Sequence, residues 1–249
     1  YLTAEGTTLG GDDGISVAYM LAVLDDDTLK HPALECVITT DEEIGLLGAK
    51  ALDTSVLKGT HMINMDSEEE GYLWISCAGG LSGTSRIPVE YQEMEGVVTE
   101  VLIDGLNGGH SGAEIDKNRA NANKLMGLFL YELGQKIEYS IKDLSGGTKD
   151  NAITRSCKAT LVLCEEDLSE AKITAEKLQK DLRSEYAGSD EGITISVTPG
   201  KEETVQALSM VSKEKVVFYL VHVPFGIEKM SGEIEGLVET SSNLGILKL

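Results

Sequence analysis

The sequence predicts an α/β protein in two parts: a partial α/β domain in residues 1–83 and an α+β, ferredoxin-like (βαββαβ) domain in residues 84–249. In the first part, apolar strand-like runs end in clusters of acidic residues. The glycine-rich stretch at residues 77–83 then interrupts this pattern and marks a domain boundary. Beyond it, the hydrophobic pattern follows the order strand, helix, strand, strand, helix, strand, which is the split βαβ arrangement.

The first part is expected to contain two helices and three strands. Apolar residues recur at helical spacing after residue 14, at Ile15, Ala18, Tyr19, Ala22 and Val23. The apolar runs at residues 34–40, 61–65 and 72–77 predict short strands. A short helix is expected around residues 47–52.

Acidic residues directly follow two of these predicted strands. Asp41, Glu42 and Glu43 come after the first strand, and Asp66 comes after the second. In open α/β sheets, ligand and metal sites lie beyond the carboxyl ends of the strands. Bunched carboxylates repel one another unless a cation or protons offset the repulsion. The pattern therefore indicates a cation site, although the run of three acids taken alone is also typical of a solvated acidic turn.

A further acidic pair, Asp12 and Asp13, precedes the first predicted helix and follows Gly10 and Gly11. Capping of the helix N-terminus explains one of the two carboxylates. It leaves the other carboxylate without a role. The two glycines also let the backbone of this turn approach other groups unusually closely. Taken alone, the motif fits a helix cap and a metal ligand equally well.

The second part is expected to hold the four strands and two helices of the split βαβ unit. The strands are predicted at residues 99–106, 139–144, 158–164 and 192–198. One helix is expected to start near Asp116, and the other follows a capping box formed by Asp167 and Glu170. Residues 212–223 fit either a helix or a strand, and residues 238–249 fit a strand.

Composition excludes several classes of function. Acidic residues outnumber basic ones by 42 to 21, and the formal charge of −21 argues against binding to nucleic acids or anionic membranes. No apolar run is long enough to predict a membrane span. The four cysteines lack C-x-x-C spacing, which favours reduced, buried thiols and a cytoplasmic location over a zinc–thiolate site.

Several motifs together resemble one family. The motifs are T-T-L-G-G-D-D-G (7–14), T-T-D-E-E-I-G (39–45), I-N-M-D-S-E-E-E-G (63–71), C-A-G-G (77–80), G-L-N-G-G-H-S-G (105–112), N-R-A-N-A-N-K-L-M-G (118–127) and G-G-T-K-D-N-A-I (146–153). Their order is similar to that of M20 metallopeptidases, and most closely to the aminoacyl-histidine (Xaa-His) dipeptidase branch. The resemblance covers nearly the whole chain and implies a zinc-peptidase-like catalytic domain followed by a lid and dimerisation domain.

The resemblance implies a site with two zinc ions. Asp12 matches the carboxylate that bridges the two ions, while Glu43 and Asp66 match the ligands of one ion each. Glu42 matches the general base, which takes a proton from a water molecule as it attacks the peptide carbonyl. The implied substrate is a small peptide.

The resemblance also gives roles to two residues of the second domain. His110 matches a lid histidine that stabilises the oxyanion of the tetrahedral intermediate, in several members at the partner subunit's active site. Asn151 matches a residue that contacts substrate, while a turn residue at a hairpin tip is an equally good interpretation. The family's dimers imply a homodimer formed through the lid domain.

The chain also departs from the family pattern. The His-x-Asp motif expected upstream of Asp12 is absent, and so is the metal-binding histidine expected near the C-terminus. We therefore expect the chain to be an internal portion of a larger dipeptidase, binding zinc weakly and having little or no activity. Two alternatives are a related metallohydrolase, such as an N-acyl-amino-acid deacylase or desuccinylase, and a non-catalytic dimerisation module.

Overall fold

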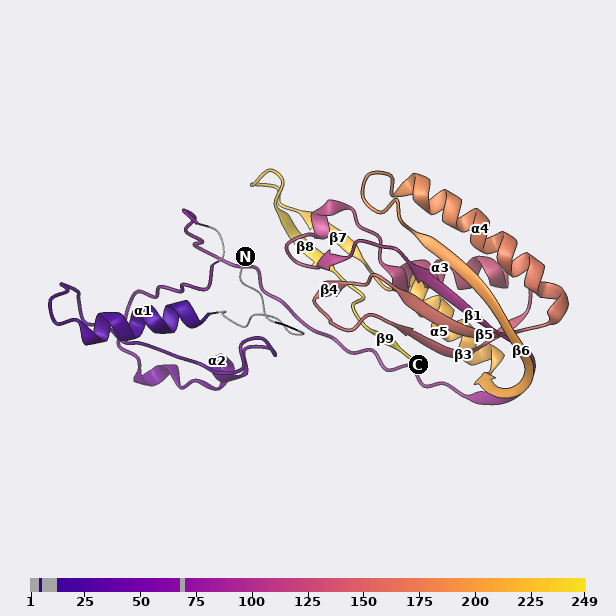
Figure 1. The fold of residues 1–249 in the computed structure, drawn as a ribbon, viewed down its shortest axis with the longest axis horizontal. Coiled ribbons are helices and arrows are strands. Elements are labelled where there is room, and N and C mark those ends of the chain that lie inside the picture. The colour runs from indigo at the N-terminus through magenta and orange to yellow at the C-terminus, as the bar shows by residue number, and fades with distance from the viewer. Residues whose placement is uncertain (1–4, 6–12, 68–69) are drawn as a thin grey trace. The chain divides into compact units, whose positions relative to one another are not determined.

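The computed structural model describes Glu5 and residues 13–67 and 70–249. By its backbone contacts the chain divides into two compact units, Tyr1–Gly79 and Gly80–Leu249. Figure 1 shows the helices of the first unit in indigo, and the sheet and helices of the second in magenta to yellow. Among the described residues, no helix is long and apolar enough to cross a membrane.

The first unit contains the two predicted helices, α1 (Gly14–Asp25) and α2 (Leu47–Ala51), and a 3₁₀ turn at Thr54–Val56. Asp13 is the N-cap of α1, and its side chain accepts the backbone N–H of Ser16 at 3.3 Å. This bond satisfies one of the free N–H groups of the first helical turn. The capping interpretation is therefore confirmed for Asp13, whereas Asp12 lies outside the described residues.

The three strands predicted in the first unit are wrong. Residues 34–40, 61–65 and 72–77 form no strand, and side chains such as Ile63, Leu73 and Ile75 are exposed. A strand exists only as part of a hydrogen-bonded ladder with a neighbour. These apolar runs have no such neighbour among the residues described in this unit, so the pattern alone does not produce a sheet.

The second unit is built on a five-stranded antiparallel sheet in the order β6-β1-β5-β3-β9. Its strands are β1 (Tyr91–Asp104), β3 (Tyr139–Gly146), β5 (Cys157–Leu163), β6 (Thr194–Leu208) and β9 (Leu247–Lys248). The order of elements is β1, α3, β3, β5, α4, β6, which confirms the ferredoxin-like prediction. A short ribbon of β2 (Gly109–His110) and β4 (Ala152–Ile153) lies beside this frame.

Helices α3 (Ala122–Gly134), α4 (Leu168–Glu185) and α5 (Met210–His222) share one core with the sheet (Figure 1). The apolar stripe of α3 supplies Phe129 and Leu133 to this core, both fully buried. Ile193 and Ile195 point inward at the start of β6 while Thr194 is exposed, as the strict alternation predicts. The core thus forms where the apolar face of the helices meets the apolar face of the sheet.

Two helix starts differ from the prediction. Near Asp116 there is only a 3₁₀ turn, Ile115–Lys117, because Asn118 adopts a left-handed conformation at φ 52° and interrupts the helix. The α-helix begins at Ala122, capped by Asn121. Asp167 makes no side-chain cap bond, since it ends a 3₁₀ turn and is itself in a helical conformation.

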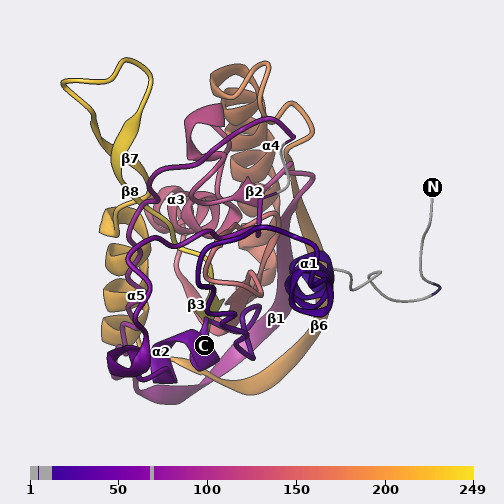
Figure 2. The same ribbon diagram turned by 90° about the vertical axis from the view of Figure 1, so that its left-hand side faces the viewer.

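The end of the chain resolves into several elements. Residues 210–222 are the helix α5, and the strand predicted at residues 238–249 is two separate strands, β8 (Val238–Ser242) and β9. β8 pairs with β7 (Gly226–Met230) in a separate two-stranded ribbon, drawn in yellow in Figure 2. Of the four free cysteines only Cys157 is buried, and its burial raises the pKa of the thiol to about 12.

Candidate functional site

The acidic residues after the predicted first strand lie in a compact turn, here called the acidic loop (residues 40–48). Its backbone folds back on itself, since Gly48 N–H donates to the Thr40 carbonyl at 3.0 Å and Leu46 N–H to the Glu42 carbonyl at 2.9 Å. A Cβ at position 48 would lie 2.5 Å from the Thr40 oxygen, so only glycine allows this approach.

The acidic loop and the start of α1 line one open hollow of about 350 Å³. The hollow is lined by Asp13, Thr39, Asp41, Glu42, Glu43 and Ile44. Four carboxylates therefore border one space within the first unit, and oxygen ligands of this kind bind divalent cations. Carboxylate oxygens are thus the right type of donor, but the described carboxylates around the hollow do not form a metal-binding group.

Not every predicted metal ligand is placed at this hollow. Glu43 lines it, as does the predicted base Glu42, but Asp66 lies in an exposed segment where its backbone N–H donates to Asn64 Oδ1 at 3.3 Å. Asp12 is outside the described residues. Within the described part of the chain, no three His, Cys, Asp or Glu side chains come together as a metal-binding group.

His110 lies on the β2–β4 ribbon of the second unit. It pairs with Ala152, and the backbone N–H of Ser111 donates to the Asn151 carbonyl at 2.9 Å. The structure thus brings together the predicted site residues His110 and Asn151. The Asn243 side chain holds both neighbours of Asn151, donating to the carbonyl of residue 150 at 3.0 Å and of residue 152 at 2.8 Å.

The imidazole of His110 has a defined hydrogen-bonding state. Its Nδ1 accepts the backbone N–H groups of Gly112 and Ala113, each at 3.1 Å. A neutral imidazole whose Nδ1 accepts must carry its proton on Nε2. The exposed ring therefore offers an N–H donor, which is the group needed to stabilise an oxyanion.

Two charged residues that the sequence interpretation missed hold the loop around His110. Glu114 Oε2 accepts the His110 backbone N–H at 2.9 Å, and Oε1 pairs with Arg119 at 2.9 Å. Arg119 in turn donates to the Gly108 carbonyl. Gly109 has φ 144°, a conformation that favours glycine, and a Cβ there would also crowd the ends of the Arg119 and Glu114 side chains, with Glu114 Oε2 at 2.6 Å.

A third missed residue, Asp190, lies beneath the same loop. Its fully buried carboxylate accepts the backbone N–H of Asn107 and of Ala120, both at 2.6 Å. These two residues bound the loop of residues 107–120, here called the His110 loop. The spacing along the sequence gives no signal of these contacts, because Asp190 lies 83 residues from Asn107 and 70 from Ala120.

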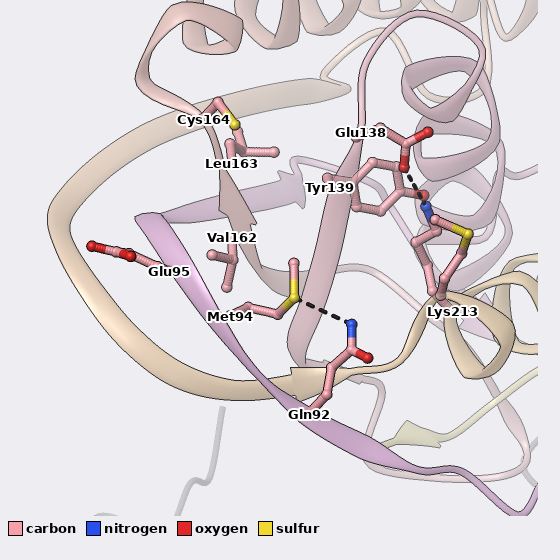
Figure 3. Close-up of a pocket in the computed structure, with 10 residues that line it drawn as sticks. Gln92, Met94, Glu95, Glu138, Tyr139, Val162, Leu163, Cys164 and Lys213 are labelled. Carbon is pink, nitrogen blue, oxygen red and sulfur yellow. Dashed lines mark hydrogen bonds and ion pairs between the residues drawn. The ribbon is translucent and has the colours of Figure 1, made fainter.

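A second cavity, of about 110 Å³, lies in the second unit between β1, β3, β5 and α5 (Figure 3). Lys213 closes one side, with its Nζ 3.7 Å from Glu138 Oε2 and 4.7 Å from the centre of the Tyr139 ring. Pockets that bind small molecules are several times larger, about 300–1,000 Å³. Lys213 and Glu138 pair with each other and the cavity is small, so we read it as a packing feature.

The comparisons with known proteins agree with the fold of the second unit. Residues 103–190 match the M20 peptidase dimerisation domain. The whole chain is 35% identical to the cytosol non-specific dipeptidase of Escherichia coli (strain K12), of which it covers 52%. The whole chain also superposes on aminoacylhistidine dipeptidase from Vibrio alginolyticus with a TM-score of 0.72 and 31% identity, again covering 52%. The chain thus spans about half the length of each relative.

Proposed function

We propose that this chain belongs to the M20 peptidase family and serves in the metal-dependent hydrolysis of dipeptides of the Xaa-His type. The observation that carries the proposal is the match along the whole chain to a structure named as an aminoacylhistidine dipeptidase. The position of Glu42 and Glu43 at one hollow supports it, because the proposal gives these two neighbouring carboxylates the roles of general base and metal ligand.

The proposed metal ligands are Asp12, Glu43 and Asp66, with zinc as the ion. Zinc, when bound, supplies charge that polarises the peptide carbonyl and makes a water molecule more acidic. Glu42 is proposed as the general base that takes a proton from the attacking water. Its place beside Glu43 on the acidic loop supports this division of roles between neighbouring carboxylates.

His110 and Asn151 are proposed to act on the substrate from the second unit. The Nε2–H of His110 donates to the carbonyl oxygen as negative charge develops there, an interaction that strengthens in the transition state. Asn151 offers an amide group to the peptide. The ribbon pairing that brings these two residues together supports a common role.

We further propose that the protein forms a homodimer through the second unit and works in the cytoplasm. The match of residues 103–190 to a peptidase dimerisation domain supports the dimer, and the name of the Escherichia coli relative supports the location. Sedimentation equilibrium of the chain tests the first point. A monomer at all accessible concentrations would contradict it.

The 249-residue chain by itself is proposed to be an incomplete catalyst. Carboxylates are its only proposed zinc ligands, and zinc in hydrolytic sites commonly takes imidazole nitrogen as well. Calorimetric titration with zinc should therefore show weak binding. Hydrolysis of an Xaa-His dipeptide should be slow for the chain alone and efficient for an enzyme of the relatives' length that contains it.

Three results would overturn parts of these proposals. Full turnover by the 249-residue chain would contradict its incompleteness. In the longer enzyme, turnover of N-acyl amino acids in place of dipeptides would assign the chain to a deacylase or desuccinylase. No hydrolysis of either substrate, with a stable dimer, would leave dimerisation as the function.

A further inference from the structure

We infer that Glu114 is a positioning residue for His110: it fixes the His110 loop so that Nδ1 remains an acceptor and the Nε2–H is presented as a donor. This inference rests on the proposed role of His110 and deepens it. On this inference the loop sets the tautomer of His110, a role that the motif G-G-H-S-G by itself does not indicate.

The first step is the pair of backbone contacts between Glu114 and His110. The carboxylate of Glu114 accepts the His110 N–H at 2.9 Å, and the N–H of Glu114 donates to the His110 carbonyl at 2.9 Å. Both main-chain polar groups of His110 therefore bond to the same residue. The turn between them cannot change conformation without breaking one of these bonds.

The second step is what the turn does to the imidazole. The N–H groups of Gly112 and Ala113 lie inside this turn and both reach Nδ1 at 3.1 Å. A free imidazole in water exchanges between its two neutral tautomers, and a bond to one nitrogen selects the other as the proton carrier. The turn closed by Glu114 thus selects the Nε2–H form.

The third step is the support that Glu114 receives. Its other oxygen pairs with Arg119 at 2.9 Å, and Arg119 also binds the Gly108 carbonyl on the far side of the histidine. The His110 N–H is the main cause that lowers the pKa of the Glu114 carboxyl, with a smaller contribution from Arg119. The acceptor is therefore charged at neutral pH, which makes the bond to His110 stronger than one to a neutral group.

Nuclear magnetic resonance on the 249-residue chain tests the inference. The ¹⁵N shifts of the imidazole report the tautomer, and amide exchange reports the bonds from Gly112 and Ala113. In E114A we expect exchange at these two amides to rise about tenfold or more, and His110 to populate the Nδ1–H tautomer as well. E114Q keeps an acceptor oxygen but loses the charge, so its effect should be smaller.

His222 is an internal control. Its Nδ1 bonds to the Phe218 carbonyl at 2.8 Å, so it holds the opposite tautomer, far from Glu114 in sequence. It should be unchanged in both variants. If E114A also loses the slow exchange of the sheet amides, the variant has lost its fold. E114Q, which preserves the size of the side chain, is then the variant compared with the unaltered chain.

The inference is overturned if His110 keeps its tautomer, and Gly112 and Ala113 keep their exchange rates, in a folded E114A or E114Q. Neither readout needs hydrolysis, so this failure is distinct from a failure of the proposed function. In an active enzyme containing this chain, E114A should lower kcat about tenfold with little change in KM, because the bond from His110 matters most in the transition state. Altered spectra with unchanged kcat would keep the positioning role and refute the role of His110 in the reaction.

Discussion

The carboxylate of Asp190 accepts the backbone N–H of Ala120 at 2.6 Å in the interior of the second unit. The same carboxylate accepts the N–H of Asn107 at 2.6 Å, so one side chain joins both ends of the His110 loop. A buried carboxylate is stable only when its oxygens are hydrogen-bonded. The two loop ends supply those bonds, and the loop is thereby fastened to the chain just ahead of β6.

Asp190→Ala should therefore lower the free energy of unfolding by about 2–4 kcal/mol, since it leaves the buried N–H of Ala120 and the part-buried N–H of Asn107 without an acceptor. Urea denaturation measures this change. Asp181→Ala is the matched control, because Asp181 is exposed and its ion pair is the surface contact with Lys177 at 3.6 Å. That variant should change stability by less than about 0.5 kcal/mol, and equal losses in the two variants would contradict the role of Asp190.

Gly109→Ala should disturb the His110 loop. Position 109 combines φ 144° with a space that the Glu114 carboxylate already fills, so a methyl group brings both backbone strain and a steric clash. We expect a loss of about 1–3 kcal/mol in thermal or urea unfolding. Gly232→Ala, where the added methyl meets open space, should be nearly neutral. A Gly109→Ala protein as stable as the control would show that position 109 does not require glycine.

Lys124→Met should weaken the end of α5. The ammonium group donates to the carbonyls of Leu220, Val221 and Val223 at 2.6–2.8 Å, which satisfies acceptors that the helix itself leaves free. The apolar stem is preserved in methionine, so the loss reports the polar contacts, about 1–3 kcal/mol. Lys177→Met on the exposed face of α4 is the control. The idea fails if the two substitutions cost the same.

The pH dependence of the His110 loop should follow Glu114. The His110 N–H, and to a smaller extent Arg119, lower the pKa of this carboxyl below its ordinary 4.5. A lowered carboxyl pKa contributes stability above the unfolded value, and this contribution is lost as the pH falls through the folded value. The ¹³C shift of the Glu114 carboxyl should thus titrate below 4.5. Arg119→Gln should raise the midpoint part of the way toward the ordinary value, because the bond from the His110 N–H remains. A midpoint at or above the ordinary value in the unaltered chain would count against the bond between Glu114 and the His110 N–H.

Glu42→Gln should separate proton transfer from metal binding. In an active enzyme containing this chain, we expect kcat to fall by about 10² to 10⁴-fold with zinc affinity nearly unchanged. Glu43→Gln, one residue away on the same loop, should instead reduce zinc affinity measured by calorimetry. An exchange of these two phenotypes would reverse the proposed roles of the neighbouring carboxylates.

The parts of the fold that were predicted correctly are those in which local periodicity and long-range pairing agree. The alternation around Ile195 and the stripe through Phe129 each place an apolar face toward the same core, so the order βαββαβ follows from the sequence. The runs at residues 34–40 and 61–65 have strand composition too, but no segment among the described residues pairs with them. Composition shows that a segment is apolar, and only a partner makes it a strand.

The candidate site divides in the same way. His110 and Asn151 were predicted from motifs, and the structure places His110 on β2 and Asn151 directly before its partner strand β4, while their roles stay predictions. The residues that hold this ribbon, including Glu114 and Asp190, carry no motif of their own. The contacts of Asp190 join chain segments 83 and 70 residues apart, which no local pattern encodes. The places of Asp12 and Asp66 in a metal site remain predictions.

The two hydrogen bonds from the Asn243 side chain to the chain around Asn151 affect the order in which the molecule folds. The two carbonyls it binds are 93 and 91 residues earlier in the sequence, so these contacts form only after a large entropic cost of loop closure has been met. The pairing of β3 with β5, by contrast, joins segments that are neighbours in the sequence and needs no such long closure. The ribbon bearing His110 should thus acquire its final geometry late in folding, and gentle denaturant should loosen it before the strands beneath it open.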